Sequence, residues 1–442
     1  MKYPKVLIVA MGRINAVDTA NNGLLLRNLF GGWPRENMAQ IYSSGDNGDE
    51  GFFGCYYQMG PQDRRFGNTF YRLKSEVQNA QVTNPPAANT VRIQLGKKNA
   101  IKSYLNQMIV GTGLYELIFR PCLSAGMLAW VKEFQPDIIF AQGYCLTFAL
   151  LPVMLKRHFE LPAAYYPTDD WPSDAYRADN CYVPLIPLFM NRVVSKAAYN
   201  LVKISTVCLA FNQYMQDEYS QRYGKKFSVL MHGDELSRFQ NAQPMRLIDP
   251  DETWIVSTGY FNEQRWSLLC DLDEACEILS VKGHRVRVTV FPVNQLAEMT
   301  PQANNFKYIH FEHCPSHDGL ASVLRSADIL FLPERFGENS KGIRLSVSSK
   351  AHLFMFSGQP TVVYSDLVTG IARYAEEDGW AAVVGQRDPR QLALVLEKLI
   401  VNNNYRQSII TCAQKTAIKN HQLSTIQQAF SDLMISALNS SQ

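Results

Sequence analysis

Short apolar runs alternate with longer helical patterns along this chain, and this alternation limits the possible folds more than any other feature. Runs that are apolar throughout and rich in β-branched residues are typical of strands buried on both faces of a parallel sheet with crossover helices. The runs cover residues 5–10, 40–43, 137–141, 163–167, 206–210 and 227–231 in the first half, and residues 254–257, 287–291, 308–311, 328–332, 361–364 and 381–384 in the second. The sequence therefore predicts an α/β protein with two parallel sheets.

The length of 442 residues indicates two domains, since a chain of this size exceeds one ordinary core. A polar stretch at 232–252, which contains Pro244 and Pro250, separates the two sets of strands and is a candidate linker. We expect Rossmann-like domains over residues 1–235 and 236–420. An amphipathic helix in residues 421–442 is expected to cross back onto the first domain. Residues 45–100 give no clear pattern, and either an acceptor-holding loop or an insertion would explain them.

Composition excludes several classes of function. A chain with 46% apolar and 19% charged residues is a packed globular protein, and a net charge of +3 gives no basic surface for nucleic acid. Residues 1–240 contain 25 Lys and Arg against 19 Asp and Glu. This excess is suited to peripheral contact with an anionic membrane, although ordinary surface variation explains it equally well.

The cysteine pattern and one uncharged stretch are informative about the cellular location of the protein. The nine cysteines are odd in number and include no C-x-x-C pair, as expected for reduced thiols in the cytoplasm. Residues 138–155 carry no charge, but Gln142, Gly143 and Pro152 interrupt them, which favours strand, turn and helix over a membrane span. We expect a cytoplasmic protein, with peripheral contact at the inner face of the membrane left open.

Polar residues follow a predicted strand in the second half. Glu334 and Glu338 come directly after the run 328–333, at the carboxyl end where open α/β sheets bind ligands. Ser348 or Ser349 at the start of the next helix would present backbone N–H groups to a diphosphate, and Lys350 would add positive charge. Carboxylates at such a strand end are suited to accept hydrogen bonds from sugar hydroxyls.

The first half contains weaker signals of the same kind. Gly12 ends the first predicted strand, and Asn22 and Gly23 precede a helical run, so this turn is a place for anionic or hydroxyl groups. A plain β–α turn is the alternative. Gln142 and Tyr144 follow another strand and are candidates for binding the acceptor.

Asp169 and Asp170 follow the strand predicted at 163–167. Either carboxylate is a candidate general base for an acceptor hydroxyl, and capping of the next helix is the equal alternative. The histidines show no metal-ligand spacing, and no D-x-D lies between apolar strand residues, so the sequence predicts neither a metal site nor a cofactor.

The segment ADILFLPERFGENSKGIRLSVSSKAHLFMFSGQPTVV resembles the donor-binding region of GT-B glycosyltransferases, in particular family-4-like bacterial enzymes. STGYFNEQRWSLL resembles their first C-domain strand, glycine loop and basic residue, with Gly259 and Arg265 at the matching places. His232-Gly233-Asp234 and Phe239 resemble their interdomain linker. The resemblance covers about three quarters of the chain, is strongest over 205–420 and is weak at 45–130.

This resemblance implies the GT-B fold, in which two parallel sheets face a central cleft. It implies a nucleoside-diphosphate sugar as donor and a glycan or lipid-linked glycan as acceptor, in a metal-independent, retaining reaction. Donor-binding residues implied are Gly12, Gly259, Arg265, His313, Glu334, Glu338, Ser348, Ser349 and Lys350, and Glu338 is also a candidate catalytic residue beside Asp169 and Asp170.

The sequence departs from the family in one respect. The E-x7-E pattern would place carboxylates at 345 and 353, where this chain has Leu345 and Leu353. Three alternatives therefore remain: an inverting enzyme that uses Asp169 or Asp170, a GT-B nucleotide-sugar epimerase or hydrolase, and a non-catalytic nucleotide-sugar or glycan-binding protein.

Overall fold

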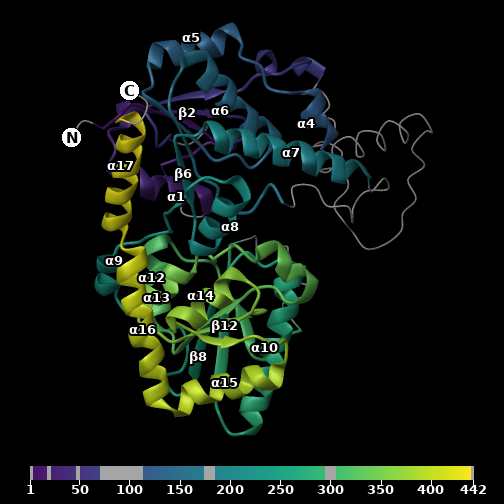
Figure 1. Ribbon diagram of the computed structural model, residues 1–442. Helices are drawn as coiled ribbons and strands as arrows, with labels where there is room; N and C mark the ends of the chain where they lie inside the picture. Colours follow the sequence, from purple (N-terminus) through teal and green to yellow (C-terminus); the bar gives the residue numbers. More distant parts are fainter. Residues whose placement is uncertain are drawn as a thin grey trace. The chain divides into compact units, whose positions relative to one another are not determined.

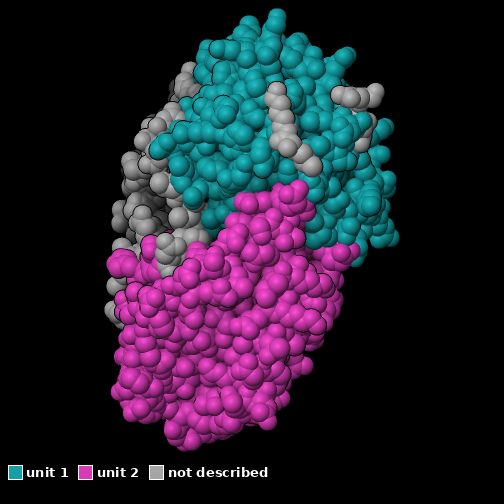
Figure 2. Space-filling view, turned by 90° about the vertical axis from the view of Figure 1, so that its left-hand side faces the viewer, with its two compact units in different colours: residues 1–210, 216–229, 430–442 teal, residues 211–215, 230–429 magenta. Residues whose placement is uncertain are grey.

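The computed structural model describes residues 3–16, 21–45, 50–69, 113–173, 185–293 and 305–439 (Figure 1). The chain divides into two compact units, which Figure 2 shows in different colours. The first unit draws on residues 1–210, 216–229 and 430–442, and the second on 211–215 and 230–429. The stretch 232–252 lies in the second unit and contains helix α9 (Leu236–Asn241).

The first unit is built on a seven-stranded parallel sheet with the order β3-β2-β1-β4-β5-β6-β7. Its strands are β1 (Val6–Val9), β2 (Met38–Tyr42), β3 (Cys55–Gln58), β4 (Ile138–Ala141), β5 (Ala163–Tyr165), β6 (Val207–Ala210) and β7 (Ser228–Val229). Six of them lie where the apolar runs predict strands. Edge strand β3 was not predicted, because its side chains are only half-buried and give no continuous apolar run.

Helices cover this sheet on both faces. Those of the first unit are α1 (Asn21–Leu29), α4 (Leu114–Ile118), α5 (Ala125–Phe134), α6 (Leu146–Phe159), α7 (Leu185–Ile204) and most of α8 (Gln213–Tyr223). Helices α5 and α6 pack on the face that carries Leu7 and Ile139. Because successive strand residues point to opposite faces, Phe140 lies on the other face. There it contacts Phe30 and Phe430, the latter from helix α17 (Leu423–Asn439).

The second unit has a six-stranded parallel sheet in the order β10-β9-β8-β11-β12-β13. The strands are β8 (Thr253–Gly259), β9 (Val286–Pro292), β10 (Ile309–Phe311), β11 (Ile329–Pro333), β12 (Thr361–Tyr364) and β13 (Ala382–Val384). All six lie where the apolar runs predict them, and all but β10, which has one buried residue in three, are buried over most of their length. Together with the first sheet, they confirm the predicted α/β architecture of two parallel sheets.

The helices of the second unit are α9, α10 (Glu263–Val281), α12 (His317–Ser326), η4 (Gly337–Ile343, a 3₁₀ helix), α13 (Ala351–Ser357), α14 (Gly370–Asp378), α15 (Pro389–Val401) and α16 (Asn403–His421). Helices α10 and α15 pack together over the sheet and share one hydrophobic core with it. Gly358 ends α13 in the left-handed conformation, with a φ of 75°, as the sequence predicts for a helix C-cap. In the part of the chain that the structure describes, no helix is both long and apolar enough to span a membrane.

Candidate functional site

Two cations and one carboxylate meet at the carboxyl ends of β8 and β11 in the second unit. Arg265 lies in the first turn of α10, and its Nη2 donates to both Glu334 carboxylate oxygens at 2.7 Å. Its Nη1 donates to the carbonyl of Tyr260 at 2.9 Å. Glu334 follows β11 directly and is only 5% exposed. The structure therefore brings together Arg265 and Glu334, both expected to bind the donor.

Lys350 completes this cluster by lying against Gly259, the last residue of β8. A Cβ at position 259 would lie 2.7 Å from the Lys350 Nζ and 3.2 Å from its Cδ and Cε. Gly259 also has a φ of 136°, which a residue with a side chain rarely adopts. The glycine is thus required both by its backbone conformation and by the space that Lys350 fills. We call Arg265, Glu334, Lys350 and Gly259 the cationic cluster.

The electrostatics of the cationic cluster favour an added anion. Burial, and after it the charge of Arg265, lower the pKa of Lys350 to about 8, while Glu334 opposes the change. Burial raises the pKa of Glu334, but Arg265 and Lys350 outweigh burial, so its net pKa is lowered and it is ionised at neutral pH. Two cations facing one carboxylate leave an excess of positive charge. A diphosphate placed here would balance that charge through charge-assisted hydrogen bonds.

The start of helix α13 differs from the prediction. Neither Ser348 nor Ser349 is the N-cap: that position is Lys350, whose side chain makes no capping hydrogen bond. Ser348 instead accepts from the backbone N–H of Ala351 through its carbonyl at 3.0 Å, in a turn that precedes the helix. Ser348 is half-buried and Ser349 is exposed. The expected serine cap is therefore wrong, because the preceding turn takes up both serines.

Glu338 and His313 lie on the surface. Glu338 is in η4, its side chain is 87% exposed, and both its oxygens accept from Lys341 Nζ at 2.9 and 2.7 Å. His313 is exposed in the loop after β10. A carboxylate so fully hydrated is a weaker candidate for sugar recognition than the buried Glu334.

The two positions where the family pattern requires carboxylates are part of the hydrophobic core. Leu345 is 3% exposed and Leu353 is 8% exposed. The carbonyl of Leu345 accepts from Asn212 Nδ2 at 2.7 Å. An ionised side chain at either place would be buried without a partner, so the leucines fit their surroundings.

In the first unit, Gly12, which is expected to bind the donor, and the predicted acceptor residues Gln142 and Tyr144 lie along the carboxyl edge of the sheet. Gly12 follows β1, and its carbonyl accepts from Gln40 Nε2 at 2.7 Å. Gln142 follows β4 and is fully buried. Tyr144 has a φ of 66°, and its hydroxyl bonds to the side chain of Thr168 and accepts from its backbone N–H at 3.1 Å. Burial raises the Tyr144 pKa, with the charge of Asp169 as the next cause, so this hydroxyl stays protonated.

The helix predicted after Asn22 and Gly23 is α1, which already begins at Asn21. Gly23 is half-buried in its first turn, and the side chain of Asn22 lies outside the described structure. A helix start next to the carboxyl ends of β1 and β2 keeps this segment a candidate for acceptor contact.

The adjacent acids Asp169 and Asp170 have different environments. Asp170 Oδ1 accepts from Arg222 Nη1 at 2.7 Å and from the Tyr219 hydroxyl at 2.9 Å. Its Oδ2 accepts from Arg222 Nη2 at 3.0 Å and from Ser173 at 2.8 Å. Asp169 is exposed. The partners of Asp170 make it a structural residue, which leaves Asp169 as the more accessible carboxylate. The sequence did not reveal Arg222, because its pairing with Asp170 joins two separate elements.

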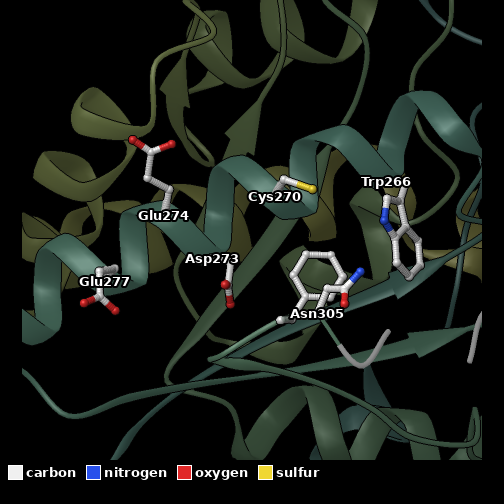
Figure 3. A pocket seen from close by; sticks show the side chains of 7 residues that line it. Trp266, Cys270, Asp273, Glu274, Glu277 and Asn305 are labelled. Atoms are coloured by element: carbon white, nitrogen blue, oxygen red, sulfur yellow. The ribbon is translucent and has the colours of Figure 1, made fainter. Parts of the chain in front are cut away.

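A hollow of about 450 Å3 lies between α10 and the segment that contains Asn305 and Phe306 (Figure 3). Two of its acidic residues form hydrogen bonds with the segment that leads into β10. Asp273 accepts from the backbone N–H groups of Lys307 and Tyr308, and Glu277 accepts from both of their side chains. We interpret this hollow as structural packing. It is lined by Trp266, Cys270, Asp273, Glu274, Glu277, Asn305 and Phe306.

No group of three or more His, Cys, Asp or Glu residues that could hold a metal ion occurs within the described ranges. The candidate site residues described above belong to the cationic cluster in the second unit and to the polar strand ends in the first.

Comparisons with known proteins give similarity in structure only. No protein-family model matches the sequence, and no curated protein matches it. HepE from Anabaena, solved in complex with UDP-glucose, matches with a TM-score of 0.58 and 13% identity over 98% of this chain and 100% of its own. The trehalose 6-phosphate synthase of Burkholderia multivorans matches with a TM-score of 0.62 and 14% identity over 99% and 98%.

A third similar structure is WaaG, a glycosyltransferase involved in lipopolysaccharide biosynthesis. It has a TM-score of 0.57 and 11% identity over 97% of this chain and 99% of its own. At these identities the likeness establishes the fold. The chain has the GT-B fold, as the sequence resemblance implied.

Proposed function

We propose that this GT-B chain is a glycosyltransferase that moves a sugar from a nucleoside-diphosphate sugar to a hydroxyl of a glycan or lipid-linked glycan. The observation that carries the proposal is the cationic cluster, in which Arg265 and Lys350 meet beside Gly259 at the carboxyl ends of two parallel strands. HepE, which has the same fold, was solved with UDP-glucose, and this supports a UDP-sugar as the first donor to test.

In the proposed reaction, the bond between the sugar C1 and the diphosphate oxygen breaks, and the acceptor oxygen forms a new bond to C1. The leaving diphosphate gains negative charge, which Arg265 and Lys350 stabilise in a partly buried setting. These two cations supply positive charge at the leaving group, so we propose that no metal is required. Glu334 positions the Arg265 guanidinium for this purpose.

We propose retention of the anomeric configuration, with the acceptor proton passing to the departing diphosphate. Support comes from Asp170, whose carboxylate is engaged by Arg222 and Tyr219 and is poorly available as a base. Asp169 remains the candidate base for an inverting reaction. Inversion at C1 in the product, together with a loss of roughly 10²–10⁴-fold in kcat for Asp169→Asn, would contradict the retaining mechanism and support an inverting one.

The first experiment measures donor binding by thermal shift with UDP, GDP, CDP, ADP, NAD and the common UDP- and GDP-sugars. We expect a rise of about several degrees with one nucleoside diphosphate. This rise should be lost in Lys350→Ala and in Arg265→Ala. The matched control is Lys341→Ala, since Lys341 is an exposed lysine paired with Glu338 outside the cationic cluster. A folded protein that no nucleotide stabilises would refute the proposed function.

Measurements of donor turnover distinguish two other functions from the proposed one. Consumption of donor without any acceptor would indicate a nucleotide-sugar epimerase or hydrolase. Binding without turnover over a broad acceptor panel would indicate a non-catalytic nucleotide-sugar or glycan-binding protein, an alternative favoured by the buried leucines at 345 and 353. Activity that persists in EDTA would support the metal-independent reaction.

A further inference from the structure

Helix α7 (Leu185–Ile204) of the first unit, labelled in Figure 1, has a row of exposed side chains that its packing does not explain. Three large apolar side chains are exposed near its start: Leu185 at 72%, Leu188 at 55% and Phe189 at 50%. With about 3.6 residues per turn, these side chains lie on one side of the helix. Exposed apolar residues grouped on one side, unlike single ones, indicate an interaction surface.

The opposite side of α7 anchors the helix to the first unit. Its buried residues are Pro187, Met190, Val194, Ala197, Ala198, Leu201 and Val202. Several of them form one core with Leu146 and Ala149 of α6 and with Trp171. The helix is therefore anchored to the first unit through this side.

Basic residues continue the exposed stripe beyond the apolar end. Arg192, Lys196 and Lys203 are exposed at the spacing that places them on the same side as Leu185. Tyr199 is 41% exposed in this stripe, and Lys196 Nζ lies 5.3 Å from the centre of its ring. The 20 residues of α7 include no Asp or Glu. We call Leu185, Leu188, Phe189, Arg192, Lys196, Tyr199 and Lys203 the α7 stripe.

We propose that the α7 stripe docks the protein on an anionic lipid surface. Apolar and aromatic side chains would enter the boundary between headgroups and acyl chains, while the lysines and the arginine pair with lipid phosphates. The positive charge of the α7 stripe favours a lipid surface over a protein partner, since the stripe contains cations and apolar groups but no acid. The proposal goes beyond the transferase reaction, because it is measured without donor or acceptor.

The test is co-sedimentation of the full chain with vesicles of phosphatidylcholine alone and with about 30% phosphatidylglycerol added. We expect binding to the anionic vesicles that weakens strongly between about 50 and 500 mM salt. The double variant Arg192→Gln with Lys196→Gln should bind the anionic vesicles about 25-fold more weakly, because each lost charge weakens binding by about fivefold. Leu185→Ser with Phe189→Ser should weaken binding by at least about tenfold.

The matched control pairs Ile418→Ser with Lys415→Gln on helix α16 of the second unit, where an exposed apolar residue lies beside an exposed lysine. This variant should bind vesicles like the unchanged protein. Equal vesicle binding by all variants would overturn the proposal, as would failure to bind anionic vesicles or capture of an acidic protein without vesicle binding. Nucleotide thermal shifts that persist in the α7 variants would show that they are folded, and would keep this test separate from that of donor binding.

Discussion

At the scale of single residues, the charge of Lys350 is the property most open to experiment. Burial and the neighbouring Arg265 lower its pKa to about 8, far below that of an exposed lysine. The ammonium is therefore protonated at neutral pH but loses its proton in a range where most proteins remain folded. A diphosphate bound beside it would favour the protonated form.

We predict that UDP binding weakens above pH 8. The sign follows from the lowered pKa: below pH 8 Lys350 is charged in the free protein, and above it each bound ligand must first restore the proton. The dissociation constant should rise by up to about tenfold per pH unit between pH 8 and 10. Titration calorimetry at each pH would measure this, together with proton uptake in buffers of different ionisation enthalpy.

Lys350→Arg provides the control for this dependence, since a guanidinium keeps its charge over the whole range. Its dissociation constant should be nearly flat from pH 7 to 10, whereas Lys341→Arg on exposed η4 should follow the unchanged protein. A pH profile that Lys350→Arg leaves unaltered would assign the titration to another group.

The sequence indicated Glu334 by its place after a strand and Lys350 by its place at a helix start, whereas Arg265 was indicated only through the family-like pattern. Their mutual contacts were not predictable, because Arg265 and Glu334 are 69 residues apart and meet only when β8 and β11 pair. The same holds for Asp170 and Arg222, which are 52 residues apart. Sequence spacing shows which residues follow a strand, but the register between strands decides which of them touch.

At the scale of elements, buried parallel strands were the most predictable feature. Twelve apolar runs correspond to strands, whereas the half-buried edge strand β3 gave no signal. Helix starts were harder to place. The two serines before α13 were predicted to form its N-cap, but the helix begins only after a turn that ends at Lys350. Local propensity marks such boundaries less sharply than burial marks strands.

Three buried histidines join separate elements of the second unit. His352 of α13 stacks between His232, which follows β7, and His421 at the end of α16, with ring centres 5.7 and 5.9 Å away. His421 Nδ1 bonds to the carbonyl of His232 at 2.6 Å, and its Nε2 to the hydroxyl of Tyr374 at 2.9 Å. Burial lowers the pKa of His232 to about 3, with His421 as a further cause, and burial lowers that of His421 to about 4.

We predict that the second unit loses stability as the pH falls below about 6.5. Unfolded histidines take up protons below that value, while His232 and His421 stay neutral in the fold down to about pH 3–4. Each contributes a loss of about 1.4 kcal/mol per pH unit within this window. Urea unfolding of the full chain at pH 7, 6 and 5 would measure it. His232→Phe, which cannot titrate, should show a shallower loss, and an unchanged slope would contradict the assignment.

At the scale of the whole molecule, the chain passes between the two units four times, at 210/211, 215/216, 229/230 and 429/430. The last passage lies inside helix α17, whose first residues belong to the second unit and whose remainder belongs to the first. The amphipathic pattern of this helix is visible in the sequence. Its aromatic partners could not be predicted, because Phe30, Trp33 and Phe140 lie some 300 to 400 residues earlier in the chain.

We predict that Phe430→Ala strongly destabilises the first unit. Phe430 is fully buried, and its ring centre lies 4.9 Å from that of Phe30, 5.7 Å from Trp33 and 5.8 Å from Phe140. Removing it leaves a cavity among these rings, at a loss of about 3–5 kcal/mol in the free energy of unfolding. Hydrogen exchange should therefore accelerate in β1 and β4.

The matched control is Leu433→Ala, because Leu433 lies one turn further along α17 and is only half-buried. Its loss should be clearly smaller, since less apolar surface leaves the core. Exchange in β8 and β9 of the second unit should stay unchanged in both variants, because Phe430 belongs to the first unit. If Phe430→Ala accelerated exchange equally in both sheets, the two units would unfold as one cooperative body, and helix α17 would be the element that couples them.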